Sequence, residues 1–114
     1  MIYPELRDIQ SLDLVPPELP PDPSDCSIRF HVAIGPRGDD AASEAYSFQV
    51  VTAAHLRRTG PRWGRGHLFL ETFDWPVVVQ AIAELMARCA RPTWEEVADE
   101  LTRELRWEIE VNGG

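Results

Sequence analysis

The 114-residue chain contains no lysine, only two cysteines and no long apolar run. No stretch approaches the ~20 apolar residues of a membrane span, and residues 1–10 lack the basic start and apolar run of a signal peptide. We therefore expect a cytoplasmic protein without a membrane partner. Cys26 and Cys89 lie far apart without metal-ligand spacing, so we expect two reduced thiols rather than a disulfide.

The formal net charge of −8 is concentrated at the two ends of the chain. Residues 1–25 carry six acids and one Arg, residues 26–92 six acids and eight Arg, and residues 93–114 seven acids and two Arg. Such a charge repels phosphate backbones and attracts basic proteins, which disfavours a nucleic-acid partner. A charge that serves only solubility is the alternative explanation.

The first half of the chain predicts strands within a single domain of residues 1–114. Residues 2–14 alternate apolar and polar side chains but slip phase between Leu6 and Ile9, as in a strand with a bulge. Residues 15–26 hold five of the ten prolines and should form a surface loop, because proline donates no ladder hydrogen bond. Residues 27–34 and 46–50 alternate regularly on either side of a Gly-Pro turn, which predicts an antiparallel hairpin.

The second half predicts helices. A short helical turn at residues 53–58 and a third β segment at residues 67–72 precede a helix that starts after Asp74 and ends near Ala90. Its expected apolar face comprises Trp75, Val78, Val79, Ile82, Leu85, Met86 and Cys89. Together the segments predict an α+β fold, with an antiparallel sheet of about four strands and two C-terminal helices packed on one face.

The run from Thr93 to Glu110 starts with a T-x-x-E capping box formed by Thr93 and Glu96. Apolar residues recur at helical spacing, so one side should be buried while an acidic side faces water. After Leu105 the pattern alternates, which predicts an exposed segment or a terminal strand. The acidic side supplies the candidate partner-binding residues, Glu95, Asp99, Glu100 and Glu104.

No residue pattern predicts a catalytic, metal or cofactor site. The histidines His31, His55 and His67 form no H-x-x-H pair, and the glycine clusters lack phosphate-loop spacing. A minor hydrolase that uses His67 or Cys26 stays open as an alternative to a non-enzymatic protein. The basic patch of Arg57, Arg58, Arg62 and Arg65 around Trp63 either pairs with the acidic ends of the chain or contacts a partner.

Several short stretches follow one another in a set order along the chain. They are Ala33-Ile-Gly-Pro36, Phe48-Gln-Val50, His55-Leu56, Trp63-Gly64, Leu68-Phe-Leu70, Phe73-Asp74, Trp94-Glu-Glu-Val97 and Arg106-Trp107-Glu108. This series resembles the immunity protein 8 family of bacterial polymorphic toxin systems, and the last two stretches are its most specific pieces. The resemblance covers nearly the whole chain from about residue 27.

The resemblance implies a non-enzymatic inhibitor that binds and neutralises a cognate toxin by direct protein–protein contact. Because toxins that degrade nucleic acid are often basic, an acidic inhibitor would gain association rate by electrostatic steering. The alternative from another class is a small adaptor or scaffold protein that binds an unrelated cellular partner.

Overall fold

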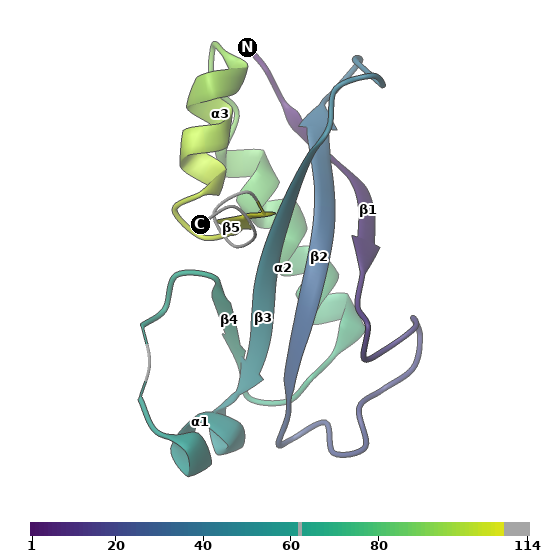
Figure 1. Cartoon of the computed structure of the whole chain (residues 1–114), viewed down its shortest axis with the longest axis vertical. Coiled ribbons are helices and arrows are strands. Elements are labelled where there is room, and N and C mark those ends of the chain that lie inside the picture. The colour runs from purple at the N-terminus through teal and green to yellow at the C-terminus, as the bar shows by residue number, and fades with distance from the viewer. Residues whose placement is uncertain (62, 109–114) are drawn as a thin grey trace.

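The computed structural model describes residues 1–61 and 63–108, and these form a five-stranded sheet and three helices (Figure 1). The expected α+β class with two C-terminal helices is confirmed. The strands are β1 (Pro4–Gln10), β2 (Ser27–Pro36), β3 (Glu44–Thr52), β4 (His67–Leu70) and β5 (Arg106–Trp107). The helices are α1 (Ala53–Thr59), α2 (Trp75–Arg88) and α3 (Trp94–Leu101).

The sheet has the order β1-β2-β3-β4, and β5 also pairs with β3. The β2–β3 hairpin is antiparallel as expected, and β1 and β5 are antiparallel to their neighbours. The sheet is mostly antiparallel, as expected, and the exception is β4, which runs parallel to β3. The reason is that α1 and the following loop carry the chain back before β4 begins, as a crossover between parallel strands requires.

The hydrophobic core lies on one face of the sheet and is centred on Phe30 of β2. The Phe30 side chain is 0% exposed. Its ring centroid lies 5.4 Å from those of Phe48 and Trp75 and 6.2 Å from that of Phe73. These rings come from β2, β3 and the segment that starts α2, so the aromatic cluster joins the hairpin to the helix.

The bulge expected in the first strand is also present. The register between β1 and β2 shifts between Leu6 and Asp8, which keeps Leu6 and Ile9 packed against the core. Residues 15–26 form neither helix nor strand. Backbone carbonyls of this loop accept hydrogen bonds from Trp75 Nε1 and from the Phe73 amide, so the loop lies against the start of α2.

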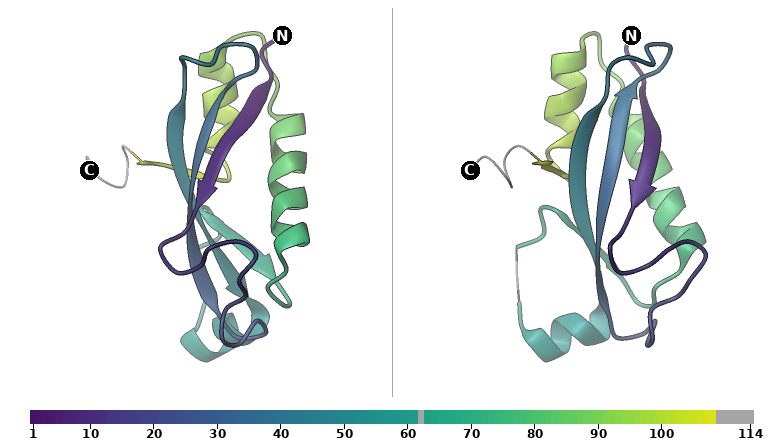
Figure 2. Two further views of the ribbon diagram at one scale, coloured as in Figure 1. Left: turned by 90° about the vertical axis from the view of Figure 1, so that its right-hand side faces the viewer. Right: turned by 45° about the vertical axis from the view of Figure 1, so that its right-hand side comes forward.

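Helix α2 runs along one face of the sheet (Figure 2). Val78, Ile82 and Leu85 are buried there as expected, whereas Val79 is 49% exposed and does not belong to the core face. Asp74 occupies the N-cap position without a side-chain capping bond. In the described ranges no helix combines the length and apolar character needed to cross a membrane.

Helix α3 is shorter than the periodicity suggested. It ends at Leu101, and the chain then forms turns that still bury Leu105 before β5 begins. The predicted cap is confirmed at Thr93, because the Glu96 amide donates to Thr93 Oγ1 at 3.2 Å, and the Thr93 hydroxyl donates in turn to Glu96 Oε1 at 3.2 Å. The expected terminal strand appears as Arg106–Trp107, while Ile109 and Glu110 lie outside the described residues.

We expect Phe30→Ala to lower the free energy of unfolding by about 3–5 kcal/mol, because it leaves a cavity among three aromatic rings. Urea unfolding followed by circular dichroism measures this loss. Val79→Ala, at an exposed position of α2, is the control and should change stability by less than about 0.5 kcal/mol. Equal losses in the two variants would contradict the placement of Phe30 at the centre of the core.

Candidate functional site

The exposed side of α3 faces an open groove that also borders β3 and β5. We name it the α3–β5 groove; its volume is about 460 Å³. It is lined by Glu44, Tyr46, Trp94, Glu95, Ala98, Asp99, Thr102 and Trp107. Figure 1 shows α3 beside the first half of β3, with β5 at the end of the helix. The groove therefore combines three aromatic and three acidic side chains from distant parts of the chain.

The helical period explains how α3 contributes to the groove. Trp94, Ala98 and Thr102 follow one another at a spacing of four residues and form one stripe of the helix surface. Glu95 and Asp99 form the adjacent stripe and are exposed. Val97 and Leu101 lie on the buried side, which fixes the orientation of both stripes relative to the sheet.

The three acidic side chains of the groove have no ion-pair partner within residues 1–61 and 63–108. Among the described residues, no basic side chain lines the groove either. Glu44 accepts a hydrogen bond of 2.8 Å from the hydroxyl of Tyr46. Burial and the Glu44 carboxylate raise the pKa of the Tyr46 phenol, because both disfavour the phenolate. The groove is thus an anionic surface with an uncompensated charge.

The other two acidic candidates lie elsewhere. Glu100 forms ion pairs with Arg91 at 3.2 Å and Arg103 at 3.5 Å, and its side chain is only 22% exposed. It joins α3 to the segment that follows α2. The sequence could not separate Glu100 from Glu95 and Asp99, because all three lie in the same acidic run.

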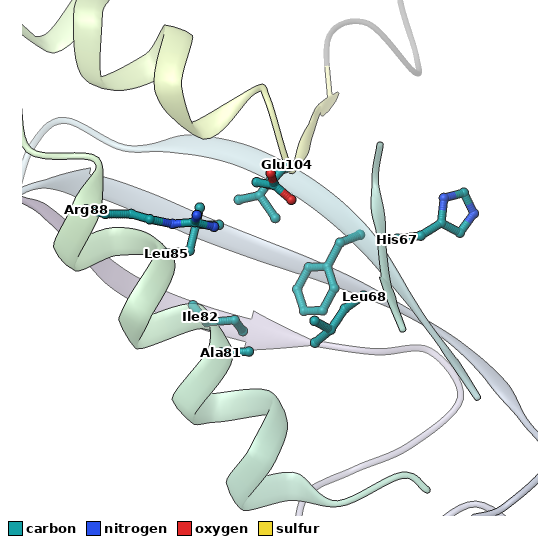
Figure 3. Close-up of a pocket in the computed structure, with 9 residues that line it drawn as sticks. His67, Leu68, Ala81, Ile82, Leu85, Arg88 and Glu104 are labelled. Atoms are coloured by element: carbon teal, nitrogen blue, oxygen red, sulfur yellow. The ribbon is translucent and has the colours of Figure 1, made fainter. Parts of the chain in front are cut away.

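Glu104 lies at a separate cavity of about 70 Å³ between α2 and β4. Figure 3 shows Ile82 and Ala81 of α2 on one side of this cavity and Leu68 on the other. The imidazole of His67 is directed away from α2, on the outer side of β4. The backbone carbonyl of Glu104 accepts a 2.8 Å hydrogen bond from Gly66, which ties the loop before β4 to the segment before β5.

Six of the eight residues that line the groove were not among the sequence candidates for partner binding. Glu44 and Tyr46 belong to β3, about fifty residues before α3, so no local pattern connects them with Glu95 and Asp99. The sequence does draw attention to Trp107, because this aromatic residue lies between the charged residues Arg106 and Glu108. Its β5 backbone pairs with β3 at Tyr46, which places both rings at the same groove.

The Glu108 side chain, next to Trp107 in the sequence, reaches β2. Glu108 Oε1 lies 2.5 Å from His31 Nδ1, although β3 separates β5 from β2 in the sheet. Glu108 also has a further interaction. Arg106 and Trp107 therefore form strand β5, Trp107 also lines the groove, and Glu108 contacts β2.

The three histidines have different partners. His31 contacts Glu108, His55 lies near Asp25 and Arg58, and His67 stacks on Phe69. Among the described residues, no group of three or more His, Cys, Asp or Glu side chains is arranged to hold a metal. None of these contacts assembles a nucleophile with a base.

Both cysteines are buried free thiols. Burial raises the pKa of each thiol, with nearby Asp22 and Asp25 adding to the effect at Cys26. A reactive cysteine requires a lowered pKa. The environment of Cys26 therefore disfavours its use as a nucleophile.

Two arginines of the basic patch in α1 and the loop before β4 already have partners within the chain. Arg58 pairs with Asp25 at 3.0 Å, and Arg65 Nε donates to the Thr102 carbonyl at 2.6 Å. The Arg58 guanidinium lowers the pKa of the Asp25 carboxyl by hydrogen bonding, against a smaller effect of burial. Trp63 is 92% exposed, and Arg62 lies outside the described residues.

Comparison with known protein families shows to which family the chain belongs. The family model described as Immunity protein 8 matches residues 5–111, which is nearly the whole sequence. The chain belongs to the immunity protein 8 family. Searches of curated proteins and of solved structures found no significant match. The immunity protein 8 assignment points to a role in a toxin system and to a toxin as the partner.

The raised pKa of Tyr46 predicts an alkaline dependence of stability. Because the folded state disfavours the phenolate, the Tyr46 contribution to stability should be constant below the unfolded pKa of about 10 and should fall above it by about 1.4 kcal/mol per pH unit, on top of the fall that the two buried thiols cause. Tyr46→Phe should remove this contribution, as measured by urea unfolding between pH 8 and 11. Tyr3→Phe controls for loss of a surface phenol, and an identical alkaline slope in Tyr46→Phe and wild type would contradict the prediction.

Proposed function

We propose that the chain is a non-enzymatic cytoplasmic protein that binds a cognate toxin directly and thereby neutralises it. Membership of the immunity protein 8 family supports a toxin as the partner. The observation that carries the choice of surface is the α3–β5 groove, whose carboxylates lack intramolecular ion pairs within the described residues. The carboxylates of this surface can therefore pair with basic side chains of a partner, whereas Glu100 already pairs with two arginines of the chain.

Of the four acidic residues that the sequence suggested, Glu95 and Asp99 are the ones we assign to partner contact. Both are exposed and both border the groove. Glu100 and Glu104 are secondary candidates, and we expect substitution of Glu100 to affect stability more than binding. The partner is a basic toxin surface, because a field of one sign accelerates encounter with the opposite sign.

An adaptor or scaffold protein of the cell is the alternative partner class. The basic loop around Trp63 favours this alternative, because the Trp63 side chain is exposed and no segment of the described structure covers it. The gene neighbourhood separates the two possibilities. An immunity protein should be encoded just downstream of a large toxin, whereas an adaptor has no such requirement.

Co-expression with the toxin domain encoded beside it should yield a complex and should restore growth of cells that produce the toxin. We expect the complex to purify at low salt and to weaken at high salt, because exposed charge pairs are screened. Charge reversal by Glu95→Arg and Asp99→Arg should slow association at least tenfold, as measured by surface plasmon resonance.

The control is Glu71→Arg, at an exposed position whose side chain forms no ion pair with another described residue. Absence of a complex at both salt concentrations would contradict toxin binding. A complex that is indifferent to both reversals would contradict only the electrostatic steering by Glu95 and Asp99.

A further inference from the structure

We propose that the α3–β5 groove receives an arginine side chain of the partner, held by aromatic rings and by the carboxylates at its border. This inference rests on the proposed function for the identity of the partner. Its chemistry rests on the groove itself, which has a volume of about 460 Å³ and, among the described residues, a lining of three aromatic side chains, three acidic ones and no basic one. The Tyr46 side chain is 0% exposed, so the two tryptophans offer the accessible aromatic surface.

The aromatic lining selects a cation that can also stack. Trp94 and Trp107 are partly exposed and pack against the core, so their rings are supported while part of each surface stays accessible. Tryptophan is the strongest aromatic partner of a cation, and the planar guanidinium of arginine stacks on such rings. Ala98 leaves space between Trp94 and Thr102 along the same stripe of α3.

The acidic border favours arginine over other cations. Glu44 is held by the hydroxyl of Tyr46, whereas Glu95 and Asp99 lie on the opposite side of the groove on α3. A guanidinium presents five donors in a fixed plane and can bond a carboxylate with two of them at once. Lysine, as a compact point charge, would gain the attraction without the stacking or the paired hydrogen bonds.

The chain already contains one intramolecular contact of this type. Arg37 lies over the ring of Tyr3, with 5.2 Å between the guanidinium carbon and the ring centroid. Both residues border a different cavity of about 260 Å³, next to β1 and α2. In that cavity an arginine of the chain itself lies against the aromatic ring. The α3–β5 groove has aromatic and acidic groups, but no arginine among the described residues that line it.

The first experiment tests the groove without the toxin. Acetyl-triarginine amide, acetyl-trilysine amide and acetyl-triglutamate amide are titrated into the ¹⁵N-labelled full chain, and the indole N–H signals of the four tryptophans are followed. Trp94→Phe and Trp107→Phe variants assign two of these signals. We expect the triarginine peptide to shift the Trp94 and Trp107 signals saturably, the trilysine peptide to bind at least threefold more weakly, and the triglutamate peptide to have no effect.

A charge-matched pair of variants separates a specific site from net charge. Glu95→Gln with Asp99→Asn should weaken triarginine binding at least fivefold. Glu71→Gln with Asp13→Asn removes the same charge at two exposed positions away from the groove and should change binding by less than twofold. Equal shifts of all four indole signals, equal binding of trilysine and triarginine, or equal weakening by the two double variants would each overturn the inference.

The second experiment uses the toxin domain encoded beside the chain. The same two double variants are compared by the dissociation constant of the complex and by its dependence on salt. At least tenfold weakening in the groove variant alone supports the inference. A change of less than twofold in that variant would overturn it while leaving neutralisation intact. Failure of the wild-type chain to bind the toxin would instead contradict the proposed function, and the peptide titration would still test the chemistry of the groove.

A second copy of the chain is the competing source of arginine. Sedimentation of the wild-type chain and the groove variant distinguishes this case. A wild-type dimer that becomes monomeric in Glu95→Gln with Asp99→Asn would overturn the assignment of the groove to the toxin. A monomeric wild-type chain supports it.

Discussion

The structure depends on strand β3, because its two edges pair with three of the other four strands. One edge pairs with β2 along the whole hairpin, from Ser27 opposite Val51 to Ile34 opposite Glu44. The second edge is shared: its later residues pair with β4 and its earlier residues with β5. The division at the second edge leaves α3 beside the start of β3, and this arrangement creates the α3–β5 groove.

The same strand carries side chains of the core and side chains of the proposed binding groove. Tyr46, Phe48 and Val50 point to the core face and are buried with the β2 residues opposite them. Glu44 lies at the beginning of β3, where the core face ends, and its carboxylate is fixed by Tyr46. A core residue therefore extends its hydroxyl to the border of the groove, so the packing of the sheet also orients one of the acidic groups.

Much of the fold could be predicted because the relevant signals are local. The hairpin follows from alternation on both sides of a Gly-Pro turn, and the start of α3 follows from Thr93 and Glu96. The end of α3 could not be predicted, since Leu101 and Leu105 keep the helical period while pairing of Trp107 with β3 requires the chain to turn. Here a tertiary contact overrides the local pattern.

The candidate site shows the same limit. The sequence identified Glu95 and Asp99 as acidic residues on an exposed helix side, but it could not show that Glu44 lies across from them, since strand pairing brings Glu44 there. It also could not show that Glu100 is engaged by Arg91 and Arg103. Glu95 and Asp99 make no such ion pairs within the described residues, so their substitution should leave the Phe30 core intact. In the role proposed for them, they can therefore change together with the partner without loss of the fold.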